Sequence, residues 1–353
     1  MTLDFPGPIV SGGIGSTILG FCDTLVREGH KVTVLFVGDV VTRNSADYWT
    51  THYAQTGIRL IHLPGRPHAP RQHLSDRPLA SYNIHKWLSE QHFDIVYFHE
   101  YMGIAYYSLT AKAAGLNFSR TLLCIGIHGP ARHALEANGM LVNNPGLIEI
   151  EAMEKECIAL ADLVISPSQY MLNWIAARKW PIHDRCYVQP NPLSIAVPPR
   201  NVGEGTPPTE IVFFGRLELG KGVDIFCDAL DVLGHKLPKE TGVTFLGKNM
   251  WIEGMRASDY IMRRARNWNV SCAVIEDLYS TDALTYLATP GRLAVMPSRS
   301  ENSPCAVQEC LQLRIPFIAS RVGGIPELVA SDDHDQVLIE PDPERLADAL
   351  ARA

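Results

Sequence analysis

Residues 293–309 read LAVMPSRSENSPCAVQE, an apolar run followed by a polar loop and the start of a helix. Ser303 is a good N-cap, and Pro304 suits the first helical position, where its missing N–H costs no hydrogen bond. Glu301 lies in the loop, and Glu309 lies five residues into the helix, about 8 Å along its axis. A strand that leads through a loop into a helix is the building unit of parallel α/β folds, so this stretch predicts the fold class.

The two carboxylates around this helix start indicate a site for a nucleotide sugar. A helix N-terminus binds anions, because amide N–H groups and the helix dipole both point there. One acid before that end and one beside it can hold hydroxyls on either side of a bound diphosphate. The residues expected to line the diphosphate are Asn302, Ser303, Pro304, Cys305 and Ala306. The alternative is an ordinary strand–loop–helix unit with two solvated glutamates, and this stretch in isolation leaves both open.

Short β-branched runs alternate with helical stretches along the whole chain, which predicts parallel α/β units. The expected strands are 31–37, 58–63, 94–99, 121–127, 163–166, 210–215, 243–247, 271–275, 293–296 and 315–320. The clearest expected helices are 16–28, 104–114, 168–178 and 344–352. Residues 2–5 have the composition of the tail of a strand, so either end of this sequence could continue in a longer protein.

Length and composition predict two domains. The chain has 353 residues, and the stretch 190–208 is rich in Pro, Gly and Asn and lacks a sustained period. We therefore expect an N-terminal domain over 1–195 and a C-terminal domain over 207–353. Residues 206–353 hold 15 Lys+Arg against 21 Asp+Glu, which leaves 16 against 17 for the first part. The second module is thus the acidic one.

Charge, cysteines and hydropathy exclude several classes of protein. A formal charge of −7 argues against nucleic acid as the main ligand. Eight cysteines without a C-x-x-C pair are typical of free thiols in a reducing cytosol. The sequence has no signal peptide and no run of 18 apolar residues, so we expect a cytoplasmic protein without a transmembrane segment. Peripheral contact with the inner face of the membrane stays open.

In the first half, two motifs follow expected strands and indicate ligand contacts. Gly12 and Gly13, in the run SGGIG at 11–15, allow backbone amides to approach a phosphate or a sugar. The third glycine of the dinucleotide fingerprint is missing, and a tight turn without a ligand is the alternative. His128 can donate a hydrogen bond to substrate, or its ring can be satisfied by nearby backbone. The pair His99–Glu100 is a weaker candidate for the acceptor side.

In the second half, the run FGRLELGKG at 214–222 brings Arg216 and Lys221 to the end of a strand. A guanidinium binds phosphate oxygens in a fork and an ammonium binds as a point charge, so both suit a diphosphate leaving group. The alternative is a solvated Arg and Lys on a turn. The glycine turn RVGGIPE at 321–327 either shapes the same site or caps a helix, and the sequence leaves this open.

Three further stretches are interpreted as structural. Asp333-His334-Asp335 matches the D-x-D pattern formally, but we interpret it as a solvated turn, and we expect no metal site. Residues 63–78 are expected to form a surface loop, with contact to an anionic acceptor or a lipid headgroup as the alternative. The cationic side chains of that loop are Arg66, His68, Arg71, His73 and Arg77. The stripe Tyr170, Met171, Trp174 and Ile175 is expected to be core.

The motifs together resemble the retaining family 4 glycosyltransferases of GT-B fold, over nearly the whole chain. They are, in order, SGGIG, H-G, SPSQY, PNP, FGRLE…KG, E-x7-E and GGIPE. The resemblance implies two Rossmann-like, doubly wound domains that face across a cleft, with the donor mostly on the second domain and the acceptor on the first. The sequence departs from the family at Asn302, where glycine is usual, and at Ser303, where an aromatic residue is common. We therefore expect a sugar pocket of different shape. The helix that closes the fold in this family is not seen before Ala353.

Carried over by position, the resemblance gives each candidate residue a role. Arg216 and Lys221 would hold the pyrophosphate, Glu301 the hydroxyls of the transferred sugar, and Glu309 the ribose. His128 would contact the sugar near the reacting carbon, while Gly12 and Gly13 would line the diphosphate. Of these residues, His128, Arg216, Lys221 and Glu301 would be the catalytic ones. The expected reaction moves a hexosyl group, glucosyl as the best choice, from a UDP-sugar to an acceptor hydroxyl, without a required cofactor.

The expected acceptor is a carbohydrate or a glycolipid, in polysaccharide or glycolipid synthesis. No carboxylate is placed as a nucleophile, because Glu301 binds sugar hydroxyls, so we expect attack from the leaving-group face. The alternatives are a nucleotide-sugar epimerase and a non-catalytic protein that binds nucleotide sugars. The missing dinucleotide fingerprint disfavours a dehydrogenase.

Overall fold

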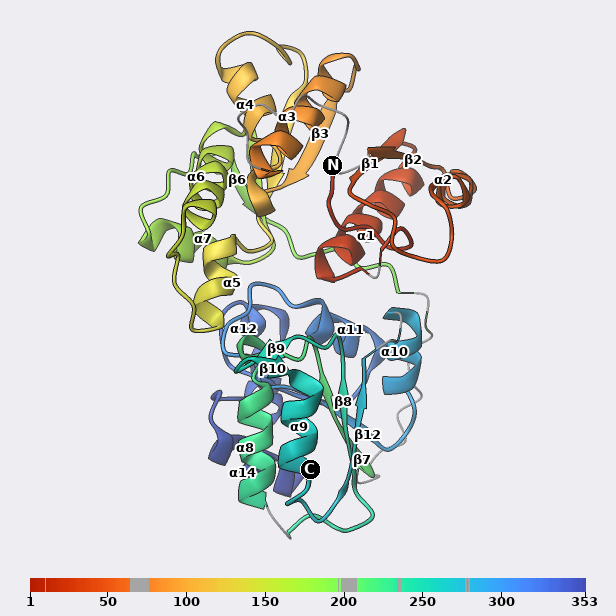
Figure 1. Cartoon of the computed structure of the whole chain (residues 1–353), viewed down its shortest axis with the longest axis vertical. Coiled ribbons are helices and arrows are strands. Elements are labelled where there is room, and N and C mark those ends of the chain that lie inside the picture. Colours follow the sequence, from red (N-terminus) through yellow and green to blue (C-terminus); the bar gives the residue numbers. More distant parts are fainter. Residues whose placement is uncertain are drawn as a thin grey trace. The chain divides into compact units, whose positions relative to one another are not determined.

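The computed structural model describes residues 1–9, 11–63, 76–195, 197, 208–233, 236–276, 278 and 280–353. The expected surface loop at 63–78, with Arg66, His68, Arg71 and His73, thus falls almost wholly outside the described residues, as does much of the expected linker. The chain divides into two compact units (Figure 1). Unit 1 comprises Met1–Leu135 and Leu141–Ser194, and unit 2 comprises Glu136–Met140 and Ile195–Ala353.

Unit 1 is built from parallel strands and helices. Strands β1 (Val32–Val37) and β2 (Ile58–Leu63) form one parallel pair. A second parallel sheet has the order β3 (Ile95–His99), β4 (Leu122–Gly126), β5 (Leu163–Ser166) and β6 (Cys186–Val188). The helices are α1 (Gly13–Arg27), α2 (Ala46–Ala54), α3 (Asp76–Ser89), α4 (Tyr106–Ala113), α5 (Ala131–Ala137), α6 (Pro145–Leu160) and α7 (Gln169–Ala177). The expected stripe on α7 is core, because Met171, Trp174 and Ile175 are buried.

Unit 2 contains a six-stranded sheet in which every neighbouring pair is parallel. Its order is β11 (Ser271–Ile275), β8 (Gly242–Leu246), β7 (Glu210–Phe214), β12 (Arg292–Met296), β13 (Phe317–Ser320) and β14 (Leu338–Ile339). Counted within the sheet, this is the doubly wound order 3-2-1-4-5-6. The order reverses between β7 and β12, and open α/β sheets bind ligands at the carboxyl ends of the strands at such a point.

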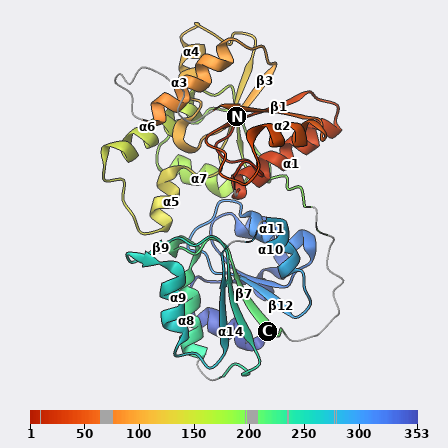
Figure 2. The same cartoon turned by 45° about the vertical axis from the view of Figure 1, so that its right-hand side comes forward.

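Helices cover both faces of this sheet (Figure 2). Helices α8 (Val223–Leu233), α9 (Ala257–Ala265) and α14 (Pro343–Arg352) pack with one face, and α10 (Ser280–Leu287), α11 (Cys305–Leu313) and α12 (Ile325–Leu328) pack with the other. The hairpin of β9 (Trp251–Ile252) and β10 (Met255–Arg256) precedes α9. The apolar residues alternate along β7 between the two faces: Ile211 and Phe213 belong to one core, and Val212 belongs to the other. Burial on both faces explains why these strands read as continuous apolar runs.

The start of α11 and the start of the chain differ from what was expected, whereas residues 333–335 agree with it. Helix α11 begins at Cys305 with Pro304 as its N-cap, one residue later than expected, and the Ser303 hydroxyl accepts from Gln308 Nε2 at 3.0 Å. Of residues 2–5, which were expected to be the tail of a strand, Thr2 pairs in a sheet-like manner, as an isolated bridge to Phe36. Residues 333–335 lie at a short 3₁₀ turn and the start of α13 (His334–Val337), and both aspartates are exposed, as expected for a solvated turn.

Across the described part of the chain, no helix combines the length and the apolar character that a bilayer crossing requires.

Candidate functional site

Three loops of unit 2 meet at the carboxyl ends of β7, β12 and β13. They are the phosphate loop (215–222), the acid loop (297–304) and the glycine turn (321–324). A Cβ atom on Gly222 would lie 2.0 Å from the carbonyl oxygen of Pro297, and one on Gly323 would lie 1.8 Å from that of Glu301. Both glycines also have positive φ, at +77° and +58°. Backbone packs directly on backbone here, which only glycine permits.

The glycine turn therefore shapes the site, which answers the question that the sequence left open. The amide of Gly324 donates to the carbonyl oxygen of Glu301 at 3.1 Å. The glycine turn thus packs against the backbone of Glu301 and holds it in place. It also leads into α12, so the motif has both of the structural roles that the sequence allowed.

Lys221 and Glu301 form the centre of this site. Lys221 Nζ lies 2.6 Å from Glu301 Oε1, and the hydroxyl of Ser298 donates to the same oxygen at 2.7 Å. Among the described residues, no donor is placed on Glu301 Oε2. An ammonium has three protons to donate, so Lys221 can bind an anion while it keeps this ion pair. The carboxylate can accept from a hydroxyl through Oε2.

Arg216 lies on the same loop but is more exposed. Its guanidinium pairs with Glu218 at 2.8 Å, and just over half of its side chain (52%) is accessible to solvent. The structure thus brings both predicted cations to one strand end, with Lys221 held by Glu301 and Arg216 held by Glu218.

A small pocket of about 30 Å³ lies beside the N-terminus of α11. Its lining is Phe214, Gly215, Lys221, Met296, Ser298, Glu301, Pro304, Ala306, Val307 and Ile325. The predicted residues Asn302 and Ser303 are buried next to it in the acid loop. The lysine, the acid and a helix N-terminus therefore converge on one pocket of unit 2, as an anion carrying a hydroxylated group would require.

Glu309 is the second acid of the motif and is buried in α11, together with Gln308 and Cys310. Burial raises its pKa to about 7, because the charged carboxylate loses hydration without a cation beside it. Hydroxyl groups that donate to this carboxylate would favour its ionised form. Glu309 is thus a buried carboxylate that could accept hydrogen bonds from the hydroxyls of a ligand, which is consistent with the expected contact to ribose.

In unit 1, the glycine loop is engaged internally by Asp4. The carboxylate of Asp4 accepts from the Gly12 amide at 3.1 and 3.2 Å and from the Gly15 amide at 3.2 Å. It also accepts from the hydroxyl of Ser11 at 2.8 Å. The predicted anion site at Gly12 therefore already holds a carboxylate of this chain. Gly13, the other predicted residue, is the first residue of α1.

His128 lies after β4, and its ring contacts a tyrosine rather than backbone. The Tyr97 hydroxyl and His128 Nε2 are 3.2 Å apart, and a Cβ on Gly126 would collide with that hydroxyl at 1.7 Å. Burial lowers the pKa of His128 to about 4, so the ring is neutral near pH 7. With the Tyr97 hydroxyl as donor, the ring proton is on Nδ1, which can then donate to a substrate oxygen.

Two buried acids hold the loop of His128 in place. Glu100 accepts from the amides of His128 and Gly129 at 2.8 and 2.6 Å, and Glu154 accepts from the amide of Ala131 at 3.0 Å. Burial raises the pKa of Glu100 to about 7 and that of Glu154 to about 8. His99 and Glu100 are fully buried, so the expectation that they contact an acceptor directly was wrong.

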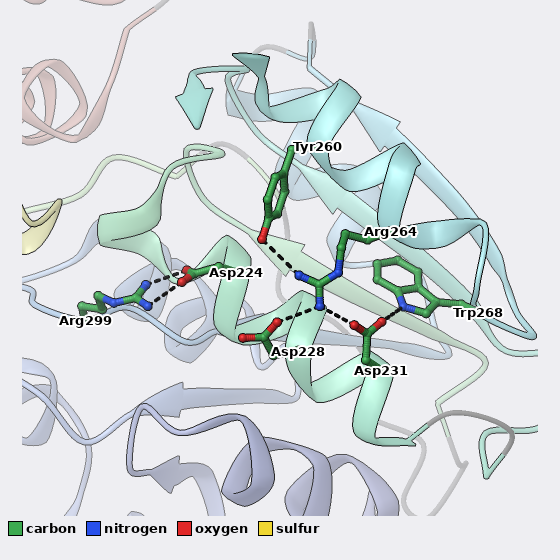
Figure 3. A network of polar contacts seen from close by, with 7 residues as sticks. All are labelled: Asp224, Asp228, Asp231, Tyr260, Arg264, Trp268 and Arg299. Atoms are coloured by element: carbon green, nitrogen blue, oxygen red, sulfur yellow. Dashed lines mark hydrogen bonds and ion pairs between the residues drawn. The ribbon is translucent and has the colours of Figure 1, made fainter. Parts of the chain in front are cut away.

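Arg299 and Asp224 were not among the predicted residues, and they belong to a set of polar contacts in unit 2 (Figure 3). Arg299 stands two positions before Glu301, and Asp224 stands three positions after Lys221, in the first turn of α8. Their closeness to the predicted motif was the available signal.

Metal-ligand geometry is not seen in the described ranges, where no group of three or more His, Cys, Asp and Glu side chains is placed to hold an ion. In the formal D-x-D stretch, Asp335 pairs with Arg321 at 2.6 Å, and His334 Nε2 lies 3.1 Å from the carbonyl oxygen of Pro326.

Comparisons with known proteins cover both units. Residues 11–196 match the model of the family described as Glycosyltransferase Family 4, and residues 208–353 match that of Glycosyl transferases group 1. D-inositol 3-phosphate glycosyltransferase of Xylanimonas cellulosilytica is 24% identical over 379 aligned positions, which cover 99% of this chain and 84% of that protein. Sulfoquinovosyl transferase SQD2 of Arabidopsis thaliana is 26% identical over 122 residues, 35% of this chain and only 21% of that protein.

Solved structures resemble the chain over nearly its whole length. Sucrose-phosphate synthase from Thermosynechococcus elongatus superposes with a TM-score of 0.66 at 16% identity, covering 97% of this chain and 84% of that one. Anabaena Alr3699/HepE in complex with UDP and glucose gives a TM-score of 0.63 at 16% identity, with 97% and 87% covered. At such identities the likeness shows the fold, and it confirms the α/β GT-B class with Rossmann-like units that the sequence predicts.

Proposed function

The chain belongs to Glycosyltransferase Family 4 by its residues 11–196, and its residues 208–353 match Glycosyl transferases group 1. We propose that it transfers a hexosyl group from a UDP-sugar to an acceptor hydroxyl, with retention of anomeric configuration. The observation that carries the proposal is the Lys221–Glu301 pair beside the N-terminus of α11. A cation, a hydroxyl acceptor and a helix N-terminus in one pocket suit a sugar diphosphate better than they suit a free sugar or a free phosphate.

The roles follow from the chemistry of each group. Lys221, Arg216 and the helix end at Ser303–Ala306 bind the diphosphate, whose negative charge grows as it leaves. Glu301 accepts from hydroxyls of the transferred sugar, and Glu309 accepts from the ribose. Gly12 and Gly13 contribute amides to the diphosphate only if the bond between Gly12 and Asp4 gives way.

The transfer step needs no nucleophile from the protein. Glu301 is tied to Lys221 and Ser298, so it is held as a hydroxyl acceptor and not as an attacking group. The bond between the anomeric carbon and the diphosphate oxygen breaks as the acceptor oxygen approaches from the same face. The acceptor proton passes to the departing diphosphate. Neutral His128 donates a hydrogen bond to the sugar from Nδ1.

The donor we propose is UDP-glucose, and the acceptor a carbohydrate or a glycolipid used in polysaccharide or glycolipid synthesis. Support for the donor comes from the Anabaena structures, which hold UDP, glucose or UDP-glucose in the same fold. A glycolipid acceptor would bring the protein to the inner face of a membrane. We expect transfer without a metal ion, because Lys221, Arg216 and the helix end supply positive charge to the diphosphate.

The test compares Lys221→Ala with Lys239→Ala, a change at an exposed lysine away from the site. UDP release from UDP-glucose is measured with and without candidate acceptors, in Mg²⁺ and in EDTA. We expect Lys221→Ala to lower turnover about 10²- to 10³-fold, as loss of a group that stabilises the transition state does, with little change in Tm. Lys239→Ala and EDTA should leave the rate within about twofold, which is below 0.5 kcal/mol.

A near-normal rate in Lys221→Ala would remove the lysine from the mechanism. Free UDP that appears only with acceptor indicates transfer. A changed sugar nucleotide without free UDP would indicate epimerisation instead. Tight UDP-glucose binding without turnover on any acceptor would indicate a binding protein.

A further inference from the structure

Arg299 holds Asp224 in a two-pronged ion pair (Figure 3). Its Nη1 donates to Oδ1 at 2.6 Å and its Nη2 donates to Oδ2 at 2.5 Å. Arg299 lies in the acid loop, two residues before Glu301, and Asp224 lies in the first turn of α8, three residues after Lys221. The ion pair therefore joins the segment that carries the acid to the segment that carries the cation.

Arg299 also holds the phosphate loop through its backbone. Its Nη1 donates to the carbonyl oxygen of Leu219 at 2.7 Å, and its amide donates to that of Gly220 at 2.9 Å. Leu219 and Gly220 open the 3₁₀ turn that ends at Lys221. One residue thus fixes the turn before Lys221 and the helix after it.

The ion pair between Arg299 and Asp224 contributes more to the geometry of the two loops than to the stability of the fold. The side chains of Arg299 and Asp224 are 38% and 21% exposed, so water screens much of their attraction. The forked geometry, in contrast, fixes both direction and distance, because a guanidinium and a carboxylate match through two parallel hydrogen bonds. A site that must bind diphosphate and sugar together needs its groups held to about 0.5 Å.

A second ion-pair network lies on the same helix and offers an internal comparison. Arg264 of α9 donates to Asp228 at 2.7 Å and contacts Asp231, which also accepts from Trp268 Nε1 at 2.6 Å. Asp228 stands one helical turn after Asp224. These contacts join α8 to α9 and involve no residue of the phosphate loop or the acid loop (Figure 3).

We propose that Asp224 and Arg299 are positioning residues of the donor site: their ion pair sets Lys221 against Glu301 so that both can engage a sugar diphosphate. The inference rests on the proposed function. It assigns a part in donor recognition to two residues that do not touch the pocket. Lys221 and Glu301 come from separate loops. Arg299 is part of the loop that carries Glu301, and it bonds to Leu219 before Lys221 and to Asp224 after it.

The experiment compares Asp224→Asn with Asp228→Asn in the full chain. UDP affinity is measured by titration calorimetry, and kcat and KM are measured with UDP-glucose. We expect Asp224→Asn to weaken UDP binding and to lower kcat, each by about tenfold, the equivalent of one lost charge-assisted hydrogen bond. Asp228→Asn should leave both within about twofold, although the two variants lose similar amounts of Tm.

Two further variants separate geometry from charge and from folding. Arg299→Lys keeps the charge but loses the fork, so it should resemble Asp224→Asn. The exchanged pair Asp224→Arg with Arg299→Asp should recover part of the lost UDP affinity, which a purely structural defect would not do. These variants also decide the question if Asp224→Asn does not fold.

The outcomes distinguish the inference from the proposed function. If the wild type binds UDP and turns over, but Asp224→Asn and Arg299→Lys both behave like Asp228→Asn, the inference is overturned and the proposed function stands. If the wild type binds neither UDP nor UDP-glucose, the proposed function is wrong and the inference falls with it.

Discussion

Among single residues, Glu309 has the clearest consequence for pH dependence. Its pKa rises from 4.5 to about 7 in the folded chain, so the folded state holds the proton more tightly than the unfolded state does. The contribution of Glu309 to the stability of the wild type should therefore fall as the pH rises from 4.5 to 7, and it should be fully lost above 7. Glu309→Gln removes this pH dependence. We expect this variant to be more stable than the wild type by about 3 kcal/mol at pH 8 and about equally stable below pH 4.5.

Urea unfolding from pH 4 to pH 8.5 measures this difference. Glu340→Gln, at an exposed position, is the control and should leave the profile unchanged. UDP affinity of Glu309→Gln should fall about tenfold at pH 8, since the amide is a weaker acceptor for ribose hydroxyls. A stability gain that is the same at every pH would show that Glu309 is not the group that titrates.

Which single residues the sequence could identify depended on whether they stand in a recognisable motif. Lys221 and Glu301 were predicted from motifs, and the structure places them in contact at 2.6 Å across 80 residues of chain. Asp4 and Tyr97 were missed because neither stands in a motif. Asp4 meets the Gly12 amide only through the fold of its own loop, and Tyr97 meets His128 only once β3 pairs with β4. The sequence of a strand does not reveal which other strand it will pair with.

At the scale of elements, Gly323 and Gly254 form a matched pair. Both have positive φ, at +58° and +80°, so an alanine at either position costs about 1 kcal/mol of backbone strain. Only Gly323 packs against the carbonyl of Glu301; a Cβ at Gly254, in the β9–β10 turn, meets no atom within 4 Å. We expect Gly254→Ala to lose about 1 kcal/mol with normal UDP affinity. Gly323→Ala should lose more stability and at least tenfold in UDP affinity.

Denaturant unfolding and UDP titration of the two variants provide the measurement. Normal UDP affinity in Gly323→Ala would mean that the acid loop tolerates displacement, and that the glycine turn only caps α12.

Secondary structure was the most predictable level of this protein. Strands buried on both faces read as apolar runs, and each expected strand in unit 2 agrees with an observed one to within two residues. The start of α11 was misplaced by one residue: Ser303 is a good N-cap by residue type and Pro304 a good first helical residue, but Pro304 takes the N-cap position. Local propensity therefore located this helix start to within one residue.

For the whole molecule, the proposed site residues are divided between the units. Arg216, Lys221, Glu301 and Glu309 belong to unit 2, whereas Gly12, Gly13 and His128 belong to unit 1. The order of the motifs along the chain matches this division, because the glycine loop and His128 precede the expected linker and the other motifs follow it. The doubly wound order of unit 2 could not be read from the sequence, since strand order depends on which crossovers form.

Hydrogen exchange in the presence of two ligands tests whether the proposed site residues of both units contact the donor. UDP alone should slow exchange in residues 215–223 and 298–310 of unit 2, where its phosphates and ribose are proposed to bind. UDP-glucose should slow these segments and also residues 126–132 of unit 1, because His128 is proposed to contact the sugar. The amides of His128 and Gly129 already donate to Glu100, so they exchange only when this loop opens, and a ligand held by the ring opposes that opening. His128→Ala should remove the second effect and keep the first. If UDP-glucose protects only unit 2 in the wild type, the sugar does not reach His128, and the proposed transfer mechanism loses its only contact from the first unit to the reacting carbon.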